Sequence, residues 1–106
     1  MLKLAVVVVA GALLCINCVN SQRTVAYLYS ERHYQGNTQN ILDPKVTRIC
    51  HQVDSVLRGV KSVKIAVPGT CIKLYSSRNC VNPSLPVNRD MPEVPKEWYI
   101  RSVGAC

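Results

Sequence analysis

The chain has 106 residues, with 13 lysines and arginines against six acidic residues and a formal net charge of +7. This length provides a single domain, and it contains no Gly-x-Ser-x-Gly, His-Glu-x-x-His or phosphate-loop motif, so the sequence does not indicate an enzyme. The two histidines, His33 and His51, have no visible partners for catalysis and are interpreted as hairpin or surface residues.

The amino-terminal segment has the layout of a secretory signal peptide. After a basic start, an apolar run covers Leu4–Ile16, and small or polar residues follow up to Ser21. We predict that residues 1–21 are a cleaved signal peptide and that residues 22–106 form one secreted, extracellular domain. A retained membrane anchor is the alternative, although the run is short for a membrane span. The remaining domain has twelve basic and six acidic residues, a net charge of +6.

The rest of the chain has the pattern of short β-strands separated by turns. Residues that favour strands recur, and no segment sustains a 3.6-residue hydrophobic period. Strands are predicted at Val25–Tyr29, Thr38–Leu42, Val46–Cys50, Ser62–Val67, Cys71–Tyr75 and Trp98–Ala105. One helical turn is expected within Gln52–Gly59, and the proline-rich segment 82–96 is expected to be an ordered loop without a helix. The predicted fold class is therefore all-β, as a sandwich or small barrel.

The most distinctive stretch is the segment Tyr29–Gly36. An aromatic residue ends a strand, four polar residues follow, and Tyr34 and Gly36 complete the pattern. We predict a hairpin that folds back over its own strand, with the ring of Tyr34 packed on that of Tyr29 and with Gly36 at a positive φ.

A weaker copy of this segment returns at Tyr75–Asn82. Cys80 replaces the second aromatic, and Asn82 replaces the glycine and is expected to take the same left-handed backbone. After a variable loop, each copy is followed by a basic residue, serine and valine, at Lys61–Val63 and at Arg101–Val103. Such a duplication in a short chain indicates two motifs that share one core.

These features resemble the βγ-crystallin Greek-key family. Its signature is an aromatic, four residues, an aromatic, one residue and glycine, followed by a serine that opens the fourth strand. The matching residues are Tyr29, Tyr34, Gly36 and Ser62 in the first motif and Tyr75 and Ser102 in the second, whereas Cys80 and Asn82 depart from the signature. The resemblance covers residues 22–106 and implies one domain of two Greek-key motifs, with eight strands in two packed four-stranded sheets.

Many members of that family bind calcium through paired Asn or Asp residues followed by hydroxyl residues, just before the fourth strand. The aligned segments here, 57–62 and 97–102, lack the paired residues, and Lys61 and Arg101 stand where a hydroxyl ligand would be. Calcium needs six to eight oxygen ligands, so we predict weak or no calcium binding and no cofactor. The degenerate calcium-site positions are Arg58, Lys61, Ser62, Arg101 and Ser102. An ordinary solvated strand position is the alternative interpretation of Lys61 and Arg101.

Four cysteines remain after removal of the predicted signal peptide: Cys50, Cys71, Cys80 and Cys106. An even number in an exported chain indicates two disulfides. Zinc ligation needs close cysteine pairs, which this segment lacks. Three pairings are open from the sequence, and Cys50–Cys71 with Cys80–Cys106 is the one we favour.

The excess of basic residues predicts attraction to an anionic surface, such as a membrane, a polysaccharide or an acidic protein. Nucleic acid is not expected as a partner. The candidate anion-binding residues are Lys61, Lys64, Lys73, Arg78 and Arg101. We expect a secreted, cationic, non-enzymatic binding module of an antimicrobial or toxin-like kind. Because the charge also fits simple solubility, an inert extracellular structural protein is one alternative; a protease inhibitor that uses loop 82–96 is another. The oligomeric state stays open.

Overall fold

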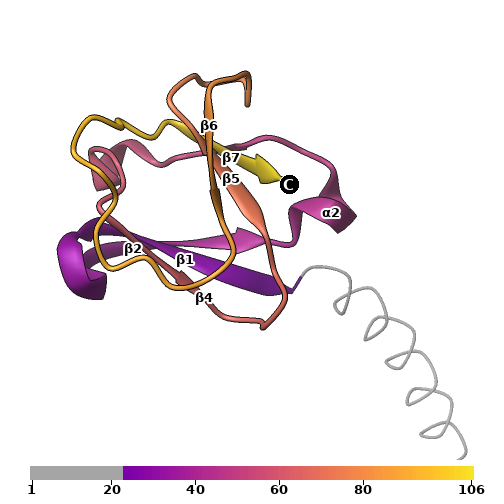
Figure 1. The fold of residues 1–106 in the computed structure, drawn as a ribbon, viewed down its shortest axis with the longest axis horizontal. Helices are drawn as coiled ribbons and strands as arrows, with labels where there is room; N and C mark the ends of the chain where they lie inside the picture. The colour runs from indigo at the N-terminus through magenta and orange to yellow at the C-terminus, as the bar shows by residue number, and fades with distance from the viewer. Residues whose placement is uncertain (1–22) are drawn as a thin grey trace, which may run out of the picture.

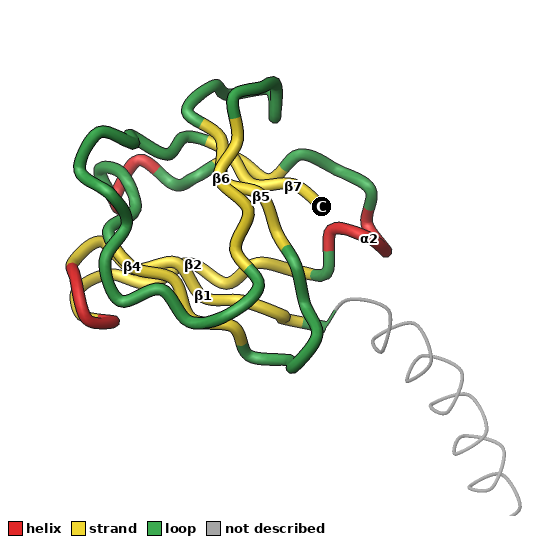
Figure 2. The backbone as a smooth tube through the Cα atoms, in the orientation of Figure 1, coloured by secondary structure: helices red, strands yellow, loops and turns green. Residues whose placement is uncertain are grey.

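The computed structural model describes residues 23–106 as two antiparallel β-sheets packed face to face (Figures 1 and 2). The predicted signal peptide, residues 1–21, lies outside the described residues. The strands are β1 (Thr24–Glu31), β2 (Gln35–Leu42), β3 (His51–Gln52), β4 (Ser62–Ile65), β5 (Ile72–Tyr75), β6 (Ser84–Val87) and β7 (Ser102–Ala105). Three short helical turns lie between strands: η1 (Arg32–Tyr34), α2 (Pro44–Thr47) and η2 (Ser55–Leu57). The predicted all-β class and the helical turn within Gln52–Gly59 are confirmed. Within residues 23–106, no helix is long and apolar enough to cross a membrane.

The two halves of the chain exchange strands between the sheets. The first sheet has the order β2-β1-β4, and the second has the order β3-β7-β5-β6. β3 belongs to the first half but pairs with β7 of the second, and Met91 of the second half forms an isolated bridge with Val63 on β4. The expected fourth strand of the first sheet is thus reduced to one bridge. This exchange means that each half completes the sheet of the other.

The core lies between the sheets and draws on both halves equally. Along β1 the inward positions Ala26 and Leu28 are fully buried, as are Val63 on β4 and Leu74 on β5. This alternation is the expected pattern for strands with one face on the core. Burying each large aliphatic side chain contributes about 1.5–3 kcal/mol relative to exposing it. The duplicated motifs therefore share a single apolar interior.

Several of the expected elements differ in the structure. The predicted strands Ser62–Val67 and Trp98–Ala105 are shorter than expected, since β4 ends at Ile65 and β7 begins at Ser102. The predicted strand Val46–Cys50 is wrong, because the chain makes the helical turn α2 there. Asp43 Oδ1 accepts a hydrogen bond from the backbone N–H of Lys45 at 3.0 Å, and Pro44 occupies the first helical position, which suits its fixed φ. The segment 82–96 contains a strand, since β6 pairs with β5 over its whole length. It is therefore only in part the loop that its prolines predicted.

The first hairpin is folded as predicted. The rings of Tyr29 and Tyr34 have centroids 5.7 Å apart at an interplanar angle of 67°, an edge-to-face contact. Gly36 has a φ of +83°. In the second hairpin Cys80, at the position of Tyr34, has a φ of +55°, matching the +62° of Tyr34. The prediction for Asn82 is wrong, because it is not among the residues of positive φ.

The disulfides join Cys50 to Cys80 and Cys71 to Cys106, so the favoured pairing was wrong. The exchange of β3 brings Cys50 to the second hairpin, where its Cα lies 5.9 Å from that of Cys80. Ile72 pairs with Ala105, so the next residues outward, Cys71 and Cys106, face each other with Cα atoms 5.6 Å apart. Strand register, which the spacing of cysteines cannot reveal, determines both bridges.

Candidate anion-binding site

Two buried serines fix the positions of the hairpins, and with them the basic residues that the hairpins carry. Ser62 and Ser102 are both 0% exposed. The Ser62 hydroxyl donates to the carbonyl oxygen of Glu31 at 2.7 Å and accepts from the backbone N–H of Tyr34 at 2.9 Å. Since a buried hydroxyl needs partners for both functions, this arrangement holds the hairpin in one position over the sheet.

The second hairpin repeats this arrangement. The Ser102 hydroxyl donates to the carbonyl oxygen of Ser77 at 2.6 Å and accepts from the backbone N–H of Cys80 at 3.1 Å. Ser77 and Cys80 lie two and five residues after Tyr75, just as the partners of Ser62 lie two and five residues after Tyr29. The backbone geometry of the motif is therefore retained although the second aromatic is absent.

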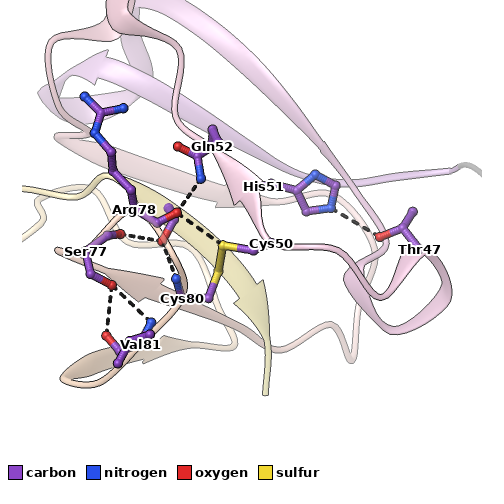
Figure 3. Close-up of a disulfide and its surroundings, with 9 residues drawn as sticks. Thr47, Cys50, His51, Gln52, Ser77, Arg78, Cys80 and Val81 are labelled. Atoms are coloured by element: carbon purple, nitrogen blue, oxygen red, sulfur yellow. Dashed lines mark hydrogen bonds between the residues drawn. A yellow bond between two sulfur atoms is a disulfide. The ribbon is translucent and has the colours of Figure 1, made fainter.

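A disulfide occupies the place of that missing aromatic (Figure 3). Cys80 is bonded to Cys50, which precedes β3. The carbonyl oxygen of Arg78 accepts a hydrogen bond from Gln52 Nε2 and lies 3.7 Å from Cys50 Sγ. The segment that includes β3 thus holds the backbone of the hairpin at Arg78.

Three guanidinium groups line one open hollow beside this hairpin. The hollow has a volume of about 280 Å³ and is lined by Arg58, Arg78 and Arg101, together with Asp54 and other residues of the η2 loop. All three arginines are exposed. Three cations against one carboxylate make the hollow positive, and the fork of donors on each guanidinium matches carboxylate, sulfate or phosphate oxygens. We call this the second-motif hollow.

The backbone at Arg101 is held on both sides. Its N–H donates to the carbonyl oxygen of Tyr75 at 2.8 Å, and its own carbonyl oxygen accepts from the N–H of Val53 at 3.0 Å. The guanidinium carbon lies 5.3 Å from the centroid of the Tyr99 ring, within the range of a cation–π contact. Arg101 is therefore fixed where its side chain reaches the hollow.

A second hollow, also of about 280 Å³, adjoins the first. Arg32, Arg58, Lys61 and Lys96 supply its positive charge, and Trp98 and Tyr99 are among its other lining residues. The backbone of Lys61 is held in the same way as that of Arg101, since its N–H donates to Tyr29 O and its carbonyl oxygen accepts from Val94 N–H, both at 2.9 Å. We call this the first-motif hollow.

Lys64 and Lys73, the other two candidate anion-binding residues, line neither hollow. Lys64 extends from β4 so that its Nζ lies 4.9 Å from the centroid of the Tyr34 ring. Burial raises the pKa of the Tyr34 phenol, and the carboxylate of Asp90 adds to this rise. Lys73 lies on β5, in register with Pro86 of β6. The structure thus brings together Lys61, Arg78 and Arg101 but not all five candidates.

The degenerate calcium positions lie in and beside the hollows. Lys61 and Arg101 contribute their charges there, whereas the hydroxyls of Ser62 and Ser102 are engaged in the hairpins. Arg58 and Lys61 also line a neighbouring hollow of about 570 Å³ that includes Glu31. Across residues 23–106, no three His, Cys, Asp or Glu side chains gather in a way that could hold a metal ion. Weak or absent calcium binding remains a prediction.

Sequence reasoning missed Arg32, Lys96 and Tyr99 as members of the site, and placed Arg58 only among the calcium positions. A signal for Arg32 was present, because it follows Tyr29 by three residues as Arg78 follows Tyr75. Nothing comparable marks Lys96, which enters the site through the path of the loop.

The two histidines lie outside both hollows. His33 Nε2 lies 3.4 Å from Glu93 Oε2 in an exposed pair. His51 Nε2 lies 3.3 Å from Thr47 Oγ1, and burial lowers the pKa of its imidazole.

Three solved structures have a similar fold. The fifth crystallin domain of the non-lens protein Absent in melanoma 1 has a TM-score of 0.62 and 18% identity, over 79% of this chain and 88% of that one. A βγ-crystallin domain from Flavobacterium johnsoniae has a TM-score of 0.64 and 18% identity, over 77% and 93%. One from Clostridium beijerinckii has a TM-score of 0.60 and 17% identity, over 76% and 94%.

By sequence alone the chain matches no protein-family model and no curated protein. The structural likeness shows a βγ-crystallin-like fold, which confirms the resemblance drawn from the hairpin signature. The neighbours are domains of a generally non-enzymatic fold. At this level of identity the likeness concerns the fold and not the ligand.

Proposed function

We propose that the protein is a secreted, non-enzymatic binding module whose basic hollows bind anionic partners. The observation that carries the proposal is the convergence of Arg58, Arg78 and Arg101 on the second-motif hollow. Like charges gather at a cost unless a partner neutralises them, and guanidinium groups stay charged at every physiological pH. An anionic ligand would relieve their repulsion.

Secretion fits the covalent structure. Two disulfides in a small domain are compatible with an extracellular protein. Outside the cell the anionic partners within reach are microbial surfaces, acidic polysaccharides and acidic proteins, so a defence or toxin-like role is the specific form of the proposal. Its test is growth inhibition of bacteria by the oxidised protein. Inhibition that high salt abolishes is expected, and inhibition that salt leaves unchanged would contradict an electrostatic mechanism.

Binding itself is tested with the oxidised secreted domain, residues 22–106, on anionic vesicles and on an acidic polysaccharide at low and high salt. The variant that removes the charge of the second-motif hollow is Arg58→Gln/Arg78→Gln/Arg101→Gln. We expect it to lose about tenfold or more in affinity, because the loss of even one charge-assisted contact costs about 1.5–3 kcal/mol.

A matched control removes three charges elsewhere, from exposed side chains: Lys45→Gln/Arg48→Gln/Arg89→Gln. Net charge falls equally in both variants. A difference in affinity between them therefore reports the contribution of the hollow and not that of the protein's overall positive charge. Equal losses in the two variants, or no salt-sensitive binding to either probe, would refute the proposal.

The protease-inhibitor alternative gains no support from segment 82–96. Met91 exchanges two backbone hydrogen bonds with Val63, at 2.8 and 2.9 Å, and the N–H of Ile65 donates to Asp90 Oδ1 at 2.8 Å. With β6 in the sheet, much of this backbone is engaged within the domain and is not free to enter a protease cleft. A panel of proteases tests this alternative. An inert structural protein would show neither binding nor inhibition.

A further inference from the structure

The two basic hollows correspond to each other under the internal repeat. Arg32 and Arg78 lie three residues after the first tyrosine of each hairpin, and Lys61 and Arg101 each precede the buried serine. Their backbone contacts match as well, since the carbonyl oxygen of Lys61 accepts a hydrogen bond from Val94 and that of Arg101 from Val53, in each case a valine of the other motif. Each hollow measures about 280 Å³. The duplication has therefore produced a pair of basic sites of equal size.

The pair meets at a single aromatic ring. Arg58, Gly59 and Tyr99 line both hollows. Gly59 and Tyr99 are equivalent positions of the repeat, three residues before Ser62 and Ser102. A Cβ on Gly59 would lie 3.0 Å from Tyr99 Cε1, so the ring lies against the glycine backbone. Tyr99 is 54% exposed, with the guanidinium carbon of Arg101 5.3 Å from the centroid of its ring. The exposed surface of Tyr99 lies between two positive hollows.

From this geometry we infer that the two hollows act together and bind an anionic polysaccharide across Tyr99, with one sulfate or carboxylate group in each hollow. The inference rests on the proposed function and specifies its ligand class. A sugar ring presents C–H groups that pack on an aromatic face, while its sulfate or carboxylate groups match guanidinium forks. A chain of anionic sugars carries sulfate or carboxylate groups at intervals along its length, so that two of them can flank an intervening ring, which is the pattern that the site requires.

The surroundings favour a polysaccharide over a lipid bilayer. Proteins that bind at a membrane surface insert apolar side chains between the lipids. Of the five exposed large apolar residues, Val56 and Tyr99 lie beside the hollows and Val81 follows Cys80 in the second hairpin, whereas Val46 and Ile49 lie on and next to α2. α2 is on the opposite side of the molecule from the η1 hairpin (Figure 1). The basic groups line recesses, which suit discrete anionic groups better than a plane of headgroups.

The test measures how affinity depends on ligand length, using heparin oligosaccharides from the disaccharide upward and the oxidised secreted domain, residues 22–106. Trp98 lines the first-motif hollow and is the single tryptophan of the sequence, so its fluorescence reports binding. If the hollows act together, affinity rises steeply, by about 100-fold, once one oligosaccharide reaches both hollows, and then levels off. We call this rise in affinity with oligosaccharide length the length step. A gradual rise in proportion to the number of sulfates would overturn the inference.

Variants test the two hollows separately. Arg78→Gln/Arg101→Gln disables the second-motif hollow, and Arg32→Gln/Lys61→Gln disables the first. All four side chains are exposed, so their removal leaves the core intact. Each variant should bind the long oligosaccharide no better than a short one, with a loss of about 100-fold. Retention of the length step in either variant would overturn the pairing of the hollows.

The control Lys45→Gln/Arg48→Gln removes two charges on and next to α2 and should keep the length step. Tyr99→Ala should weaken long oligosaccharides about tenfold while leaving salt dependence unchanged, because it removes packing and no charge. Salt-sensitive binding to phosphatidylserine vesicles or single-stranded RNA without a length step for heparin would refute the polysaccharide inference but leave the proposed function standing. No salt-sensitive binding to any of these probes would refute both.

Discussion

Ser62 and Ser102 show how a single hydroxyl can hold a whole hairpin. Each is completely buried, donates to one backbone carbonyl and accepts from one backbone N–H across the motif. Because water cannot replace a partner at such a site, the loss of the hydroxyl leaves two backbone groups unsatisfied.

We therefore expect Ser62→Ala and Ser102→Ala each to lower the free energy of unfolding by about 1–3 kcal/mol. Urea denaturation measures the loss. Ser55→Ala is the matched control, because Ser55 is exposed and its hydroxyl makes no hydrogen bond within the described residues. A loss in Ser62→Ala no larger than in the control would contradict this role.

Gly36 and Gly69 show two different structural reasons for a glycine. Both have a positive φ, +83° and +87°. A Cβ on Gly36 would overlap Ser30 Oγ and lie 2.5 Å from Glu31 Cγ, whereas one on Gly69 would have no heavy atom within 4 Å. Ser30 Oγ also accepts a hydrogen bond from the N–H of Asn37 at 2.8 Å, which a clash would disturb.

Gly69→Ala should lower the free energy of unfolding by about 1–2 kcal/mol, the cost of the left-handed backbone alone. Gly36→Ala should cost about 1–3 kcal/mol more, because the overlap adds strain. Thermal and urea unfolding compare the two variants directly. Equal losses in the free energy of unfolding would show that the first hairpin makes room for the added Cβ without strain.

At the scale of elements, the second hairpin replaces an aromatic contact with a covalent one. Cys80 stands where Tyr34 stands in the first hairpin and is bonded to Cys50 in the segment before β3. The same segment reaches Arg78 through Gln52. The disulfide therefore stabilises both the hairpin and a basic residue of the site.

The double variant Cys50→Ala/Cys80→Ala should lose about 3–4 kcal/mol of stability and bind heparin more weakly, because Arg78 is released. Cys71→Ala/Cys106→Ala is the matched control. Its cysteines are 35 residues apart against 30, so loop entropy predicts a similar loss of stability. Binding should fall only in the first variant, and equal binding in both would contradict the role of the disulfide at Arg78.

The prediction of weak or absent calcium binding concerns the loops before β4 and β7. Lys61 and Arg101 bring positive charge to the two aligned segments, and the serines that follow them are engaged in the hairpins. A divalent cation would meet repulsion and too few oxygen ligands there. Titration of the chelator-treated protein with calcium in a calorimeter should therefore give no saturable heat. A micromolar dissociation constant would show that other oxygens complete a site.

Local patterns in the sequence predicted the elements that depend on neighbouring residues. The hairpin Tyr29–Gly36 was predicted down to its ring contact and its positive φ. Val46–Cys50 was not, because its β-branched residues favour a strand while the cap at Asp43 and Pro44 favours a turn of helix, and the local cap prevailed. β6 was missed because the prolines of segment 82–96 suggested a loop, although a strand at the edge of a sheet, such as β6, tolerates proline.

Contacts between distant segments could not be predicted in the same way. The pairing of Cys50 with Cys80 depends on the exchange of β3 between the sheets, for which the sequence has no local sign. The basic site has the same origin, since Arg78 and Arg101 come to lie beside Arg58 only through this exchange. Resemblance to a known family predicted the overall architecture, but only the structure showed that these cysteines and these arginines lie close together.

At the scale of the molecule, the exchange of strands makes each half depend on the other. β3 of the first half is paired with β7, and Met91 of the second half with Val63. We expect the fragments 22–67 and 68–106 to be unfolded separately, without a cooperative thermal transition or dispersed amide resonances, because neither can cover its apolar face. Mixed in equal amounts under oxidising conditions, they should regain the transition of the intact chain as Cys50 joins Cys80 across the cut. A sigmoidal transition in either fragment alone would mean that one motif has its own core and that the exchanged strands are dispensable to the fold.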